Sequence, residues 1–444
     1  MKHFVACLSL FPLVLLSCKD SPKLPPAPAG DFNAKAPSRK DPGKEGSPLG
    51  VSAPLRLASS SASAPEAVKL MLWHSYRAKE RAALEASAAR INARAAGFTI
   101  ELLAVPFDAL PDKISNAIPR GHGPDLFIFA HDRIGDWAKT GLIAPLDAHM
   151  TEAIARRFIR PALDAFVQRG SLFGLPLAVK PLALFYNRAL VKDPPPSTDR
   201  MVQVAKAATD KAKGVFGLVY ENGDPFFHAP WMHGFGAKFL TVQNAPALDS
   251  PEQAKALAFA RALDAEHGVV PKEVSGGLVS NLFNAGKAAM VIQGPWFLGD
   301  IESVDFGVAP LPGVSATGMA AATLFTSEGV IVSAKSTKIA AAAKAAEHLT
   351  RDEEALERAL VGRQPVANAN VYDNPKVKTD AILMAFRGQL ERAVATPAVP
   401  EMRHVWTPLQ KALSKVLRGL AKPEDALKAA QREAEASIKM ASKR

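Results

Sequence analysis

The sequence GPDLFIFAHDRIGDWAKTGL, residues 123–142, joins a short buried strand directly to a helix and decides the fold. Leu126 to Phe129 form an uninterrupted apolar run whose length suits a buried strand. Apolar residues then recur at helical spacing from Ile134 to Leu142. Three polar residues, His131 to Arg133, lie between the two elements. They therefore emerge where a buried strand ends, and in an open α/β sheet ligands bind at that edge.

Asp132 and Arg133 have two interpretations. Aspartate is common at helix N-caps, so Asp132 could serve only to begin the following helix. That role alone would explain neither the adjacent arginine nor the aromatic residues on both sides. The combination favours a binding site.

Strands and helices alternate along the rest of the chain, which predicts βαβ units and an α/β fold with mostly parallel sheets. At 444 residues the chain exceeds the usual size of one hydrophobic core, so we expect two domains. Residues 221–228 are predicted to form a polar and aromatic loop. We predict strands at residues 68–73, 98–105, 126–129, 172–179, 182–186, 215–220, 288–293 and 328–333, and helices at 79–95, 109–118, 254–266, 337–349 and 424–439.

Residues 123–142 closely resemble a segment of the maltose-binding proteins, the solute-binding components of bacterial ATP-binding-cassette sugar importers. In that family the segment contains GPDI, then AHDR, an apolar residue, glycine, an aromatic residue and GL. Further matching segments follow in the same order over about residues 67–435. The resemblance implies a periplasmic-binding-protein-like fold, with two α/β lobes joined by a hinge and the ligand in the cleft between them.

The resemblance also implies lobe boundaries. The N-terminal lobe would comprise residues 67–178 and 328–375, and the C-terminal lobe residues 179–327 and 376–444. Chain crossings between the lobes are expected near residues 178–180, 326–328 and 372–378.

A neutral sugar needs hydrogen-bonding partners for its hydroxyls and flat aromatic partners for its CH faces. The resemblance places such residues at several strand ends. Phe129 stands where relatives carry tryptophan, and Asp224 stands where they carry glutamate. For Trp296 and Trp406 the alternative is packing in the hydrophobic core. The implied ligand-binding residues are Phe129, Asp132, Arg133, Asp224, Phe226, Phe227, Trp296 and Trp406.

Two further candidates depart from the family. Arg77 occupies the position of an acid that contacts sugar in relatives, and Tyr76 is the candidate replacement. Lys180 occupies the position of a glutamate that binds hydroxyls. A lysine there indicates an anionic or different oligosaccharide, or else an ion pair with Asp132 or Asp224.

The N-terminus predicts export. Residues 1–17 have a basic start and an apolar run too short to span a bilayer, as in a signal peptide. Leu15 to Cys18 resemble the lipobox of bacterial lipoproteins, which implies that Cys18 is acylated and anchors the protein to a membrane. The alternative is an ordinary signal peptide that contains cysteine. Residues 18–66, rich in Pro, Ser, Ala and Lys, would form a disordered linker. The protein would then be periplasmic or cell-surface.

Other functional classes fit less well. The net charge of +11 is scattered among acids, so we expect no nucleic-acid partner. Enzyme motifs such as a phosphate loop, G-x-S-x-G or H-E-x-x-H are missing from the sequence. A surface glycosidase using Asp132 and Asp224, and a zinc carrier, are the weaker alternatives. The zinc carrier would use His74, His131, His228 and His233. We expect a monomer without catalysis, cofactor or metal, which meets an oligosaccharide, a permease and, through its lipid, a membrane.

Overall fold

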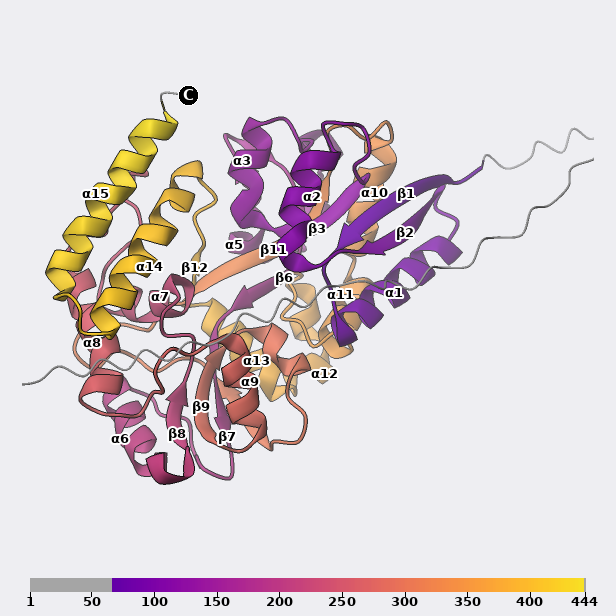
Figure 1. The fold of residues 1–444 in the computed structure, drawn as a ribbon. Coiled ribbons are helices and arrows are strands. Elements are labelled where there is room, and N and C mark those ends of the chain that lie inside the picture. The colour runs from indigo at the N-terminus through magenta and orange to yellow at the C-terminus, as the bar shows by residue number, and fades with distance from the viewer. Residues whose placement is uncertain (1–65, 443–444) are drawn as a thin grey trace, which may run out of the picture. The chain divides into compact units, whose positions relative to one another are not determined.

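The computed structural model describes residues 66–442 (Figure 1). The fold is built on two main β-sheets. The first sheet has the order β12-β11-β3-β1-β2, and β6 pairs with β11. Its strands are β1 (Val68–His74), β2 (Phe98–Ala104), β3 (Leu126–Ala130), β6 (Leu175–Pro181), β11 (Leu324–Val332) and β12 (Val394–Ala395). The second sheet has the order β10-β7-β9-β8, from β7 (Ala183–Asn187), β8 (Phe216–Val219), β9 (Ala288–Gln293) and β10 (Phe306–Ala309). A small hairpin pairs β4 (Val167–Gln168) with β5 (Ser171–Leu172).

The α/β fold is confirmed, but the pairing is mixed rather than mostly parallel. β1 runs parallel to β2 and β3, β11 to β12, and β8 to β9. The other pairs of the two main sheets are antiparallel. Short helical crossovers impose parallel pairing on β1, β2 and β3. β11 instead returns to the first sheet after the chain has built the second sheet, so no local crossover sets its direction.

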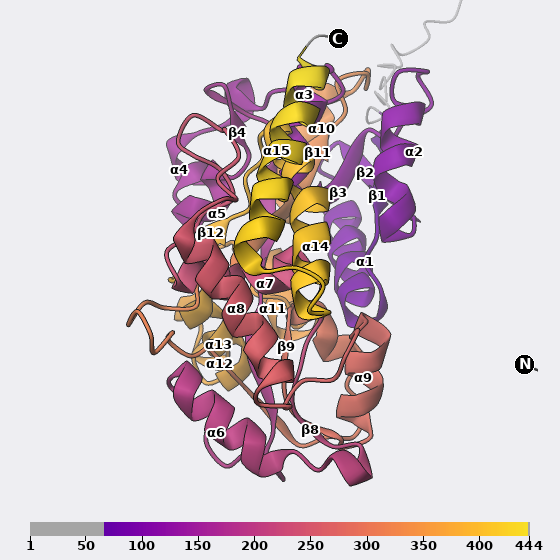
Figure 2. The same cartoon turned by 60° about the vertical axis from the view of Figure 1, so that its left-hand side comes forward.

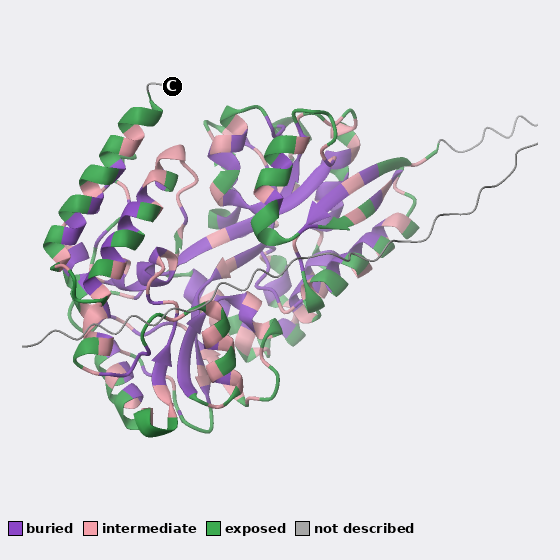
Figure 3. Cartoon of the chain, viewed as in Figure 1, coloured by how far each residue is buried: buried purple, intermediate pink, exposed green. Residues whose placement is uncertain are grey.

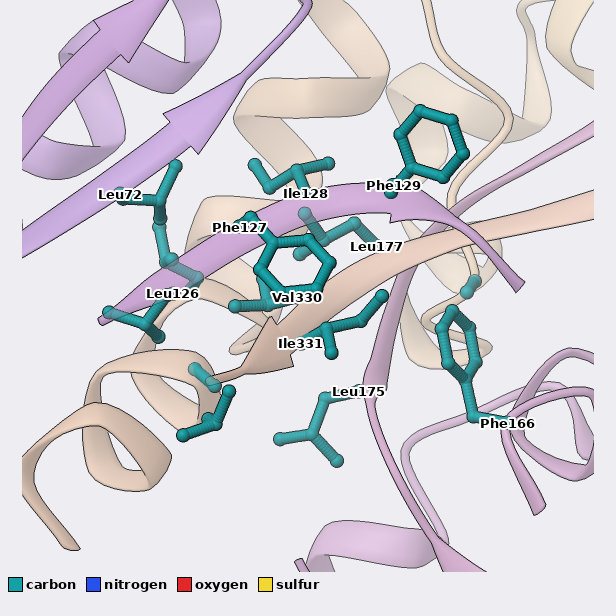
Figure 4. Packing of buried hydrophobic residues seen from close by; sticks show 14 of the residues in the cluster. Leu72, Leu126, Phe127, Ile128, Phe129, Phe166, Leu175, Leu177, Val330 and Ile331 are labelled. Carbon is teal, nitrogen blue, oxygen red and sulfur yellow. The ribbon is translucent and has the colours of Figure 1, made fainter. Parts of the chain in front are cut away.

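The core of the first sheet is centred on β3. All five residues of β3, Leu126 to Ala130, are buried. Figure 4 shows Phe127 beside Val330 and Ile331 of the antiparallel neighbour β11. Burying each large apolar side chain contributes about 1.5 to 3 kcal/mol, so this strand anchors the edge from which Asp132 and Arg133 emerge.

Helices cover the sheets, and their outward faces are exposed (Figure 3). α10 packs on β1, β2, β6 and β11, while α14 and α15 lie side by side with α8 against both (Figure 2). The helices of the first part of the chain are α1 (Ala78–Ala93), α2 (Leu110–Ala117), α3 (Ile134–Lys139), α4 (Glu152–Ala155), α5 (Arg160–Asp164), α6 (Thr198–Ala208), α7 (Pro225–Gly234), α8 (Pro251–Ala265) and α9 (Gly276–Asn284). The later helices are α10 (Ile339–Leu349), α11 (Asp352–Leu360), α12 (Pro375–Lys378), α13 (Ala381–Leu390), α14 (Arg403–Leu417) and α15 (Pro423–Ala441).

The predicted loop at residues 221–228 is wrong, because α7 begins at Pro225. Asp224 caps this helix, and its Oδ1 accepts a hydrogen bond of 2.7 Å from the Phe226 N–H. Aspartate at the N-cap followed by proline at the first helical position is a helix-start signal. The aromatic residues that follow obscured it.

The chain passes from the first sheet to the second at Leu182, between β6 and β7. The lobe boundaries remain a prediction. The expected signal peptide, Cys18 and all but the last residue of the linker lie outside the described residues. None of the helices in residues 66–442 is long and apolar enough to span a membrane.

Candidate functional site

Trp296 is held at the end of β9, in a 3-10 helix of residues Pro295–Gly299. Its Nε1–H donates a 3.0 Å hydrogen bond to Gln293 Oε1. The Nε2–H of Gln293 donates in turn to Glu221 Oε1 at 3.3 Å. The indole also lies against Gly294, where a Cβ would come within 2.2 Å of the ring, so only glycine fits there. These contacts fix the orientation of the ring.

A cavity of about 160 Å³ borders Trp296. It brings together the segment after β1, the segment after β9 and the loop after α11. The indole therefore packs partly on the core of the second sheet and partly against open space. The lining residues are Arg77, Ala78, Lys79, Glu80, Pro295, Trp296, Leu298, Gly299, Asp300, Gly362 and Arg363.

Asp224, Phe226 and Phe227 lie at the start of α7, each in a different setting. The Phe226 ring is 6.5 Å from the indole, centroid to centroid, and is half-buried. Phe227 is buried within the apolar core. Burial raises the pKa of Asp224, although the hydrogen bond from the Phe226 N–H opposes the rise. The Asp224 carboxylate thus has a structural role as a cap, whatever it does toward a ligand.

Lys180 forms ion pairs with two carboxylates that sequence reasoning missed. Its Nζ is 3.2 Å from Glu80 Oε1 and 3.1 Å from Glu328 Oε2. The expected pairing with Asp132 or Asp224 is therefore wrong. Burial alone would lower the pKa of Lys180, but the two carboxylates outweigh it and raise that pKa above the ordinary lysine value. Both partners are remote in sequence, so no local pattern could have indicated them.

Tyr76 is buried beside this ion-pair group. Its ring centroid is 5.4 Å from Lys180 Nζ, and only 3% of the residue is exposed. The hydroxyl has no hydrogen-bond partner within residues 66–442. Burial and the neighbouring Glu328 raise the pKa of Tyr76. In this arrangement the Tyr76 ring packs against the Lys180 ammonium group and is shielded from solvent.

Asp132 and Arg133 occupy a 3-10 turn, His131–Arg133, directly after β3. Neither this turn nor α3 is capped by a side-chain hydrogen bond, so the capping interpretation of Asp132 is wrong. The Arg133 Nε lies 3.7 Å from Asp132 Oδ2. Burial raises the pKa of Asp132 to about 6, and Arg133 opposes the rise. The Asp132 side chain keeps 34% of its surface exposed, so the carboxyl is still accessible to solvent.

Three of the four histidines of the zinc alternative, His74, His131 and His233, form hydrogen bonds with the backbone, and His228 is fully buried. His131 Nδ1 accepts a hydrogen bond from the Ser327 N–H, and its Nε2–H donates to the Thr396 carbonyl at 2.8 Å. Burial lowers its pKa to about 4, which keeps the ring neutral. Within residues 66–442, no three His, Cys, Asp or Glu side chains are grouped to hold a metal ion.

Phe129 and Trp406, the other two predicted aromatic contacts, pack against neighbouring rings. Phe129 is 3% exposed and stacks on Phe107, with ring centroids 5.2 Å apart and planes 14° from parallel. Phe107, which the sequence reasoning missed, is the ring left 54% exposed at that position. Its place just after the predicted strand 98–105 was the available signal. Trp406 is half-buried on α14, 5.4 Å from the Phe239 ring.

The structure brings Trp296 and Glu80 to one cavity and places Tyr76 with Lys180. The lining of that cavity does not include Asp132 or Arg133. The predicted ligand-binding residues therefore do not all line one cavity: Trp296 borders it, Tyr76 lies with Lys180, and Asp132 and Arg133 lie elsewhere.

Comparison with known proteins shows one family. The sequence profile of the family described as bacterial extracellular solute-binding protein matches residues 75–356. A maltotriose-binding protein of Pyrococcus abyssi is 27% identical over 356 residues, which are 79% of this chain and 78% of that protein. The solved structure of the MalE maltose/maltodextrin-binding domain of Bdellovibrio bacteriovorus, bound to maltotriose, superposes with a TM-score of 0.75 and 27% identity, covering 84% of this chain and 100% of that one. A cyclo/maltodextrin-binding protein complexed with maltotetraose gives a TM-score of 0.77 and 27% identity, covering 85% and 98% of the two chains.

Proposed function

The chain belongs to the bacterial extracellular solute-binding proteins, and we propose that it captures a neutral oligosaccharide, a maltodextrin, for an ATP-binding-cassette importer. The observation that carries the proposal is the cavity where Trp296 and Glu80 meet. An indole face suits the CH face of a sugar ring, and a carboxylate suits its hydroxyls. A maltotriose-binding relative and solved structures that hold maltotriose and maltotetraose match most of the chain, which supports this ligand class.

The charges around Lys180 favour a neutral ligand over an acidic one. A free lysine near the site would attract a uronic acid or another anionic sugar. Here Glu80 and Glu328 lie within 3.2 Å of its Nζ, so two carboxylates already pair with the lysine. Lys180 therefore offers no unpaired cation to an acidic sugar.

We propose that the protein catalyses nothing. Its family is one of binding proteins. The Asp224 carboxylate already accepts a hydrogen bond from the backbone of α7, so it is engaged in capping that helix. Incubating the protein with maltotetraose for a day and separating the products by chromatography tests this. Any protein-dependent cleavage would contradict it.

Trp296→Ala should weaken maltotriose binding by roughly fivefold to tenfold, because a lost aromatic stack is worth on the order of 1 kcal/mol or more. Intrinsic tryptophan fluorescence should change when the wild-type protein binds sugar, and titration on both proteins gives the two dissociation constants. Leu420→Ala is the control, since this apolar residue is exposed and does not line the cavity. A folded Trp296→Ala protein with wild-type affinity would show that the ring only supports the core.

The protein is exported, as its family implies. We propose that it is also a lipoprotein, cleaved before Cys18 and acylated there, and that it delivers its ligand to permease subunits as a monomer. Changing Cys18 to Ala should move the protein from the membrane fraction to the soluble fraction, because the acyl chains supply the membrane affinity. Immunoblots of the two fractions measure this. Retention of the variant in the membrane fraction would contradict the anchor.

A further inference from the structure

A second cavity, of about 140 Å³, is lined by residues of α3 and of the β4–β5 hairpin. Pro400, from the segment between β12 and α14, completes its wall. A buried water needs roughly 10 to 15 Å³, so the cavity admits a larger group, of the size of a phosphate. It shares no lining residue with the cavity bordered by Trp296. The lining residues are Gly135, Ala138, Lys139, Gln168, Arg169, Ser171, Phe173 and Pro400.

Two cations border this second cavity without an acid to neutralise them. Lys139 and Arg169 are both exposed, and none of the lining residues is acidic. The acids closest to them in sequence, Asp136 and Asp164, each pair with another arginine, at 3.1 Å and 2.7 Å. Within residues 66–442 neither cation forms an ion pair or a side-chain hydrogen bond. Their positive charge is therefore available to a ligand in the cavity.

Uncharged donors complete the set. The Gln168 Nε2–H donates a hydrogen bond to the Ala398 carbonyl at 3.4 Å, and a side-chain amide has a second hydrogen to donate. Ser171 adds a hydroxyl. A guanidinium can bind two oxygens of one phosphate, and a lysine pairs with phosphate as a point charge. The cavity thus offers the donors that an anion with several acceptor oxygens needs.

The turn that carries Arg169 does not favour an arginine. Gln168 pairs with Ser171 across the hairpin, so Arg169 and Gly170 form a two-residue turn. Both have a positive φ, 50° for Arg169 and 83° for Gly170, as in a type I′ turn. The first position of that turn suits asparagine, aspartate or glycine, because other side chains in the left-handed region crowd the backbone. An arginine at this position indicates a role for its guanidinium.

We propose that this cavity is a binding site for a phosphate group, held by the charges of Arg169 and Lys139 and by hydrogen bonds from Ser171 and Gln168. The group is carried either by inorganic phosphate or by a phosphate ester, since both present charged oxygens. The site does not depend on the proposed sugar site, because the two cavities have no lining residue in common.

Arg169→Asn tests the proposal without endangering the fold. Asparagine suits the first position of a type I′ turn, so the variant should melt at or above the wild-type temperature while lacking the guanidinium. Isothermal titration with phosphate, near neutral pH and at constant ionic strength set by chloride, should show saturable binding of one phosphate to the wild-type protein. The dissociation constant should rise about tenfold or more in Arg169→Asn, because a charge-assisted contact is lost.

Lys139→Gln should weaken phosphate binding by a similar factor, since it removes the second charge from the cavity. Arg120→Gln is the matched control, because Arg120 is an exposed arginine that lines neither cavity, and it should leave the affinity unchanged. Repeating the titrations with glycerol phosphate distinguishes the two sources. Tighter binding of inorganic phosphate assigns the site to the free anion, and tighter binding of glycerol phosphate assigns it to an ester. A wild-type protein that binds neither, or an Arg169→Asn protein that binds them as tightly as the wild type, would overturn the proposal.

Discussion

Lys180→Met should lower the free energy of unfolding by about 3 to 5 kcal/mol, the usual cost of removing one partner from a buried ion pair. Methionine is close to lysine in length and apolar, so little packing is lost. What is lost is the cation between Glu80 and Glu328, whose carboxylates would then face each other with fewer partners. Urea unfolding followed by circular dichroism measures the change.

Lys79→Met is the matched control for this experiment. Lys79 precedes Glu80 on α1, is exposed and borders the cavity next to Trp296. Its loss should change stability by less than about 0.5 kcal/mol, as is usual for surface substitutions. Equal stability of the two variants would show that the ion-pair group around Lys180 contributes nothing, and the charge argument for a neutral ligand would lose its support.

We propose that Asp132 is a sugar contact outside the cavity bordered by Trp296, so Asp132→Ala should weaken maltotriose binding by roughly tenfold or more. Arg133 would keep its demand for a partner, while the sugar hydroxyl would lose a charge-assisted acceptor. The binding should also depend on pH in the wild-type protein. Since burial raises the pKa of Asp132 to about 6, the carboxylate gains a proton as the pH falls through that value. Affinity should therefore fall several-fold between pH 7.5 and pH 5. In Asp132→Asn this fall should be much smaller.

Removing the Asp132 carboxylate should lower the affinity for sugar without lowering the stability of the folded protein. The pKa of Asp132 is higher in the folded protein than its ordinary value of 3.8, so the folded state holds its proton more tightly than the unfolded state. The ionised carboxylate therefore lowers stability above about pH 6, and this cost disappears as the pH falls below the ordinary value. Asp132→Ala should be as stable as the wild-type protein at pH 7, or more stable.

Asp112→Ala is the control for Asp132→Ala, since it removes an exposed acid from the first turn of α2. It should leave the affinity unchanged. Titration and thermal melting on both variants decide the matter. An Asp132→Ala protein that melts earlier yet binds with wild-type affinity would remove Asp132 from the site.

Much of the fold follows from local sequence patterns. The strand predicted at residues 288–293 is β9, Ala288–Gln293, and the helix predicted at 337–349 is α10, Ile339–Leu349. These segments are predictable because their apolar residues have a clear period or run length. α7 was missed because its many aromatic residues leave no polar face to reveal a helical period.

The site is less predictable, because its contacts join distant parts of the chain. Lys180 meets Glu80, 100 residues away, and the pattern around either residue gives no sign of the other. Burial is equally hard to predict at a strand end. Phe129 was expected at the ligand, but the stacking Phe107 covers it and is itself the exposed ring. Trp296 differs because it follows directly on the predicted strand 288–293, and its ring packs against Gly294 and lines the cavity.

The central claim is that this protein binds a neutral maltooligosaccharide. The most direct test is isothermal titration calorimetry of the wild-type protein with maltose, maltotriose and maltotetraose, and with an oligogalacturonate of matching length. We predict saturable binding of one maltooligosaccharide per protein and no binding of the acidic oligosaccharide. Saturable binding of the oligogalacturonate, with no heat from the three glucans, would contradict the claim.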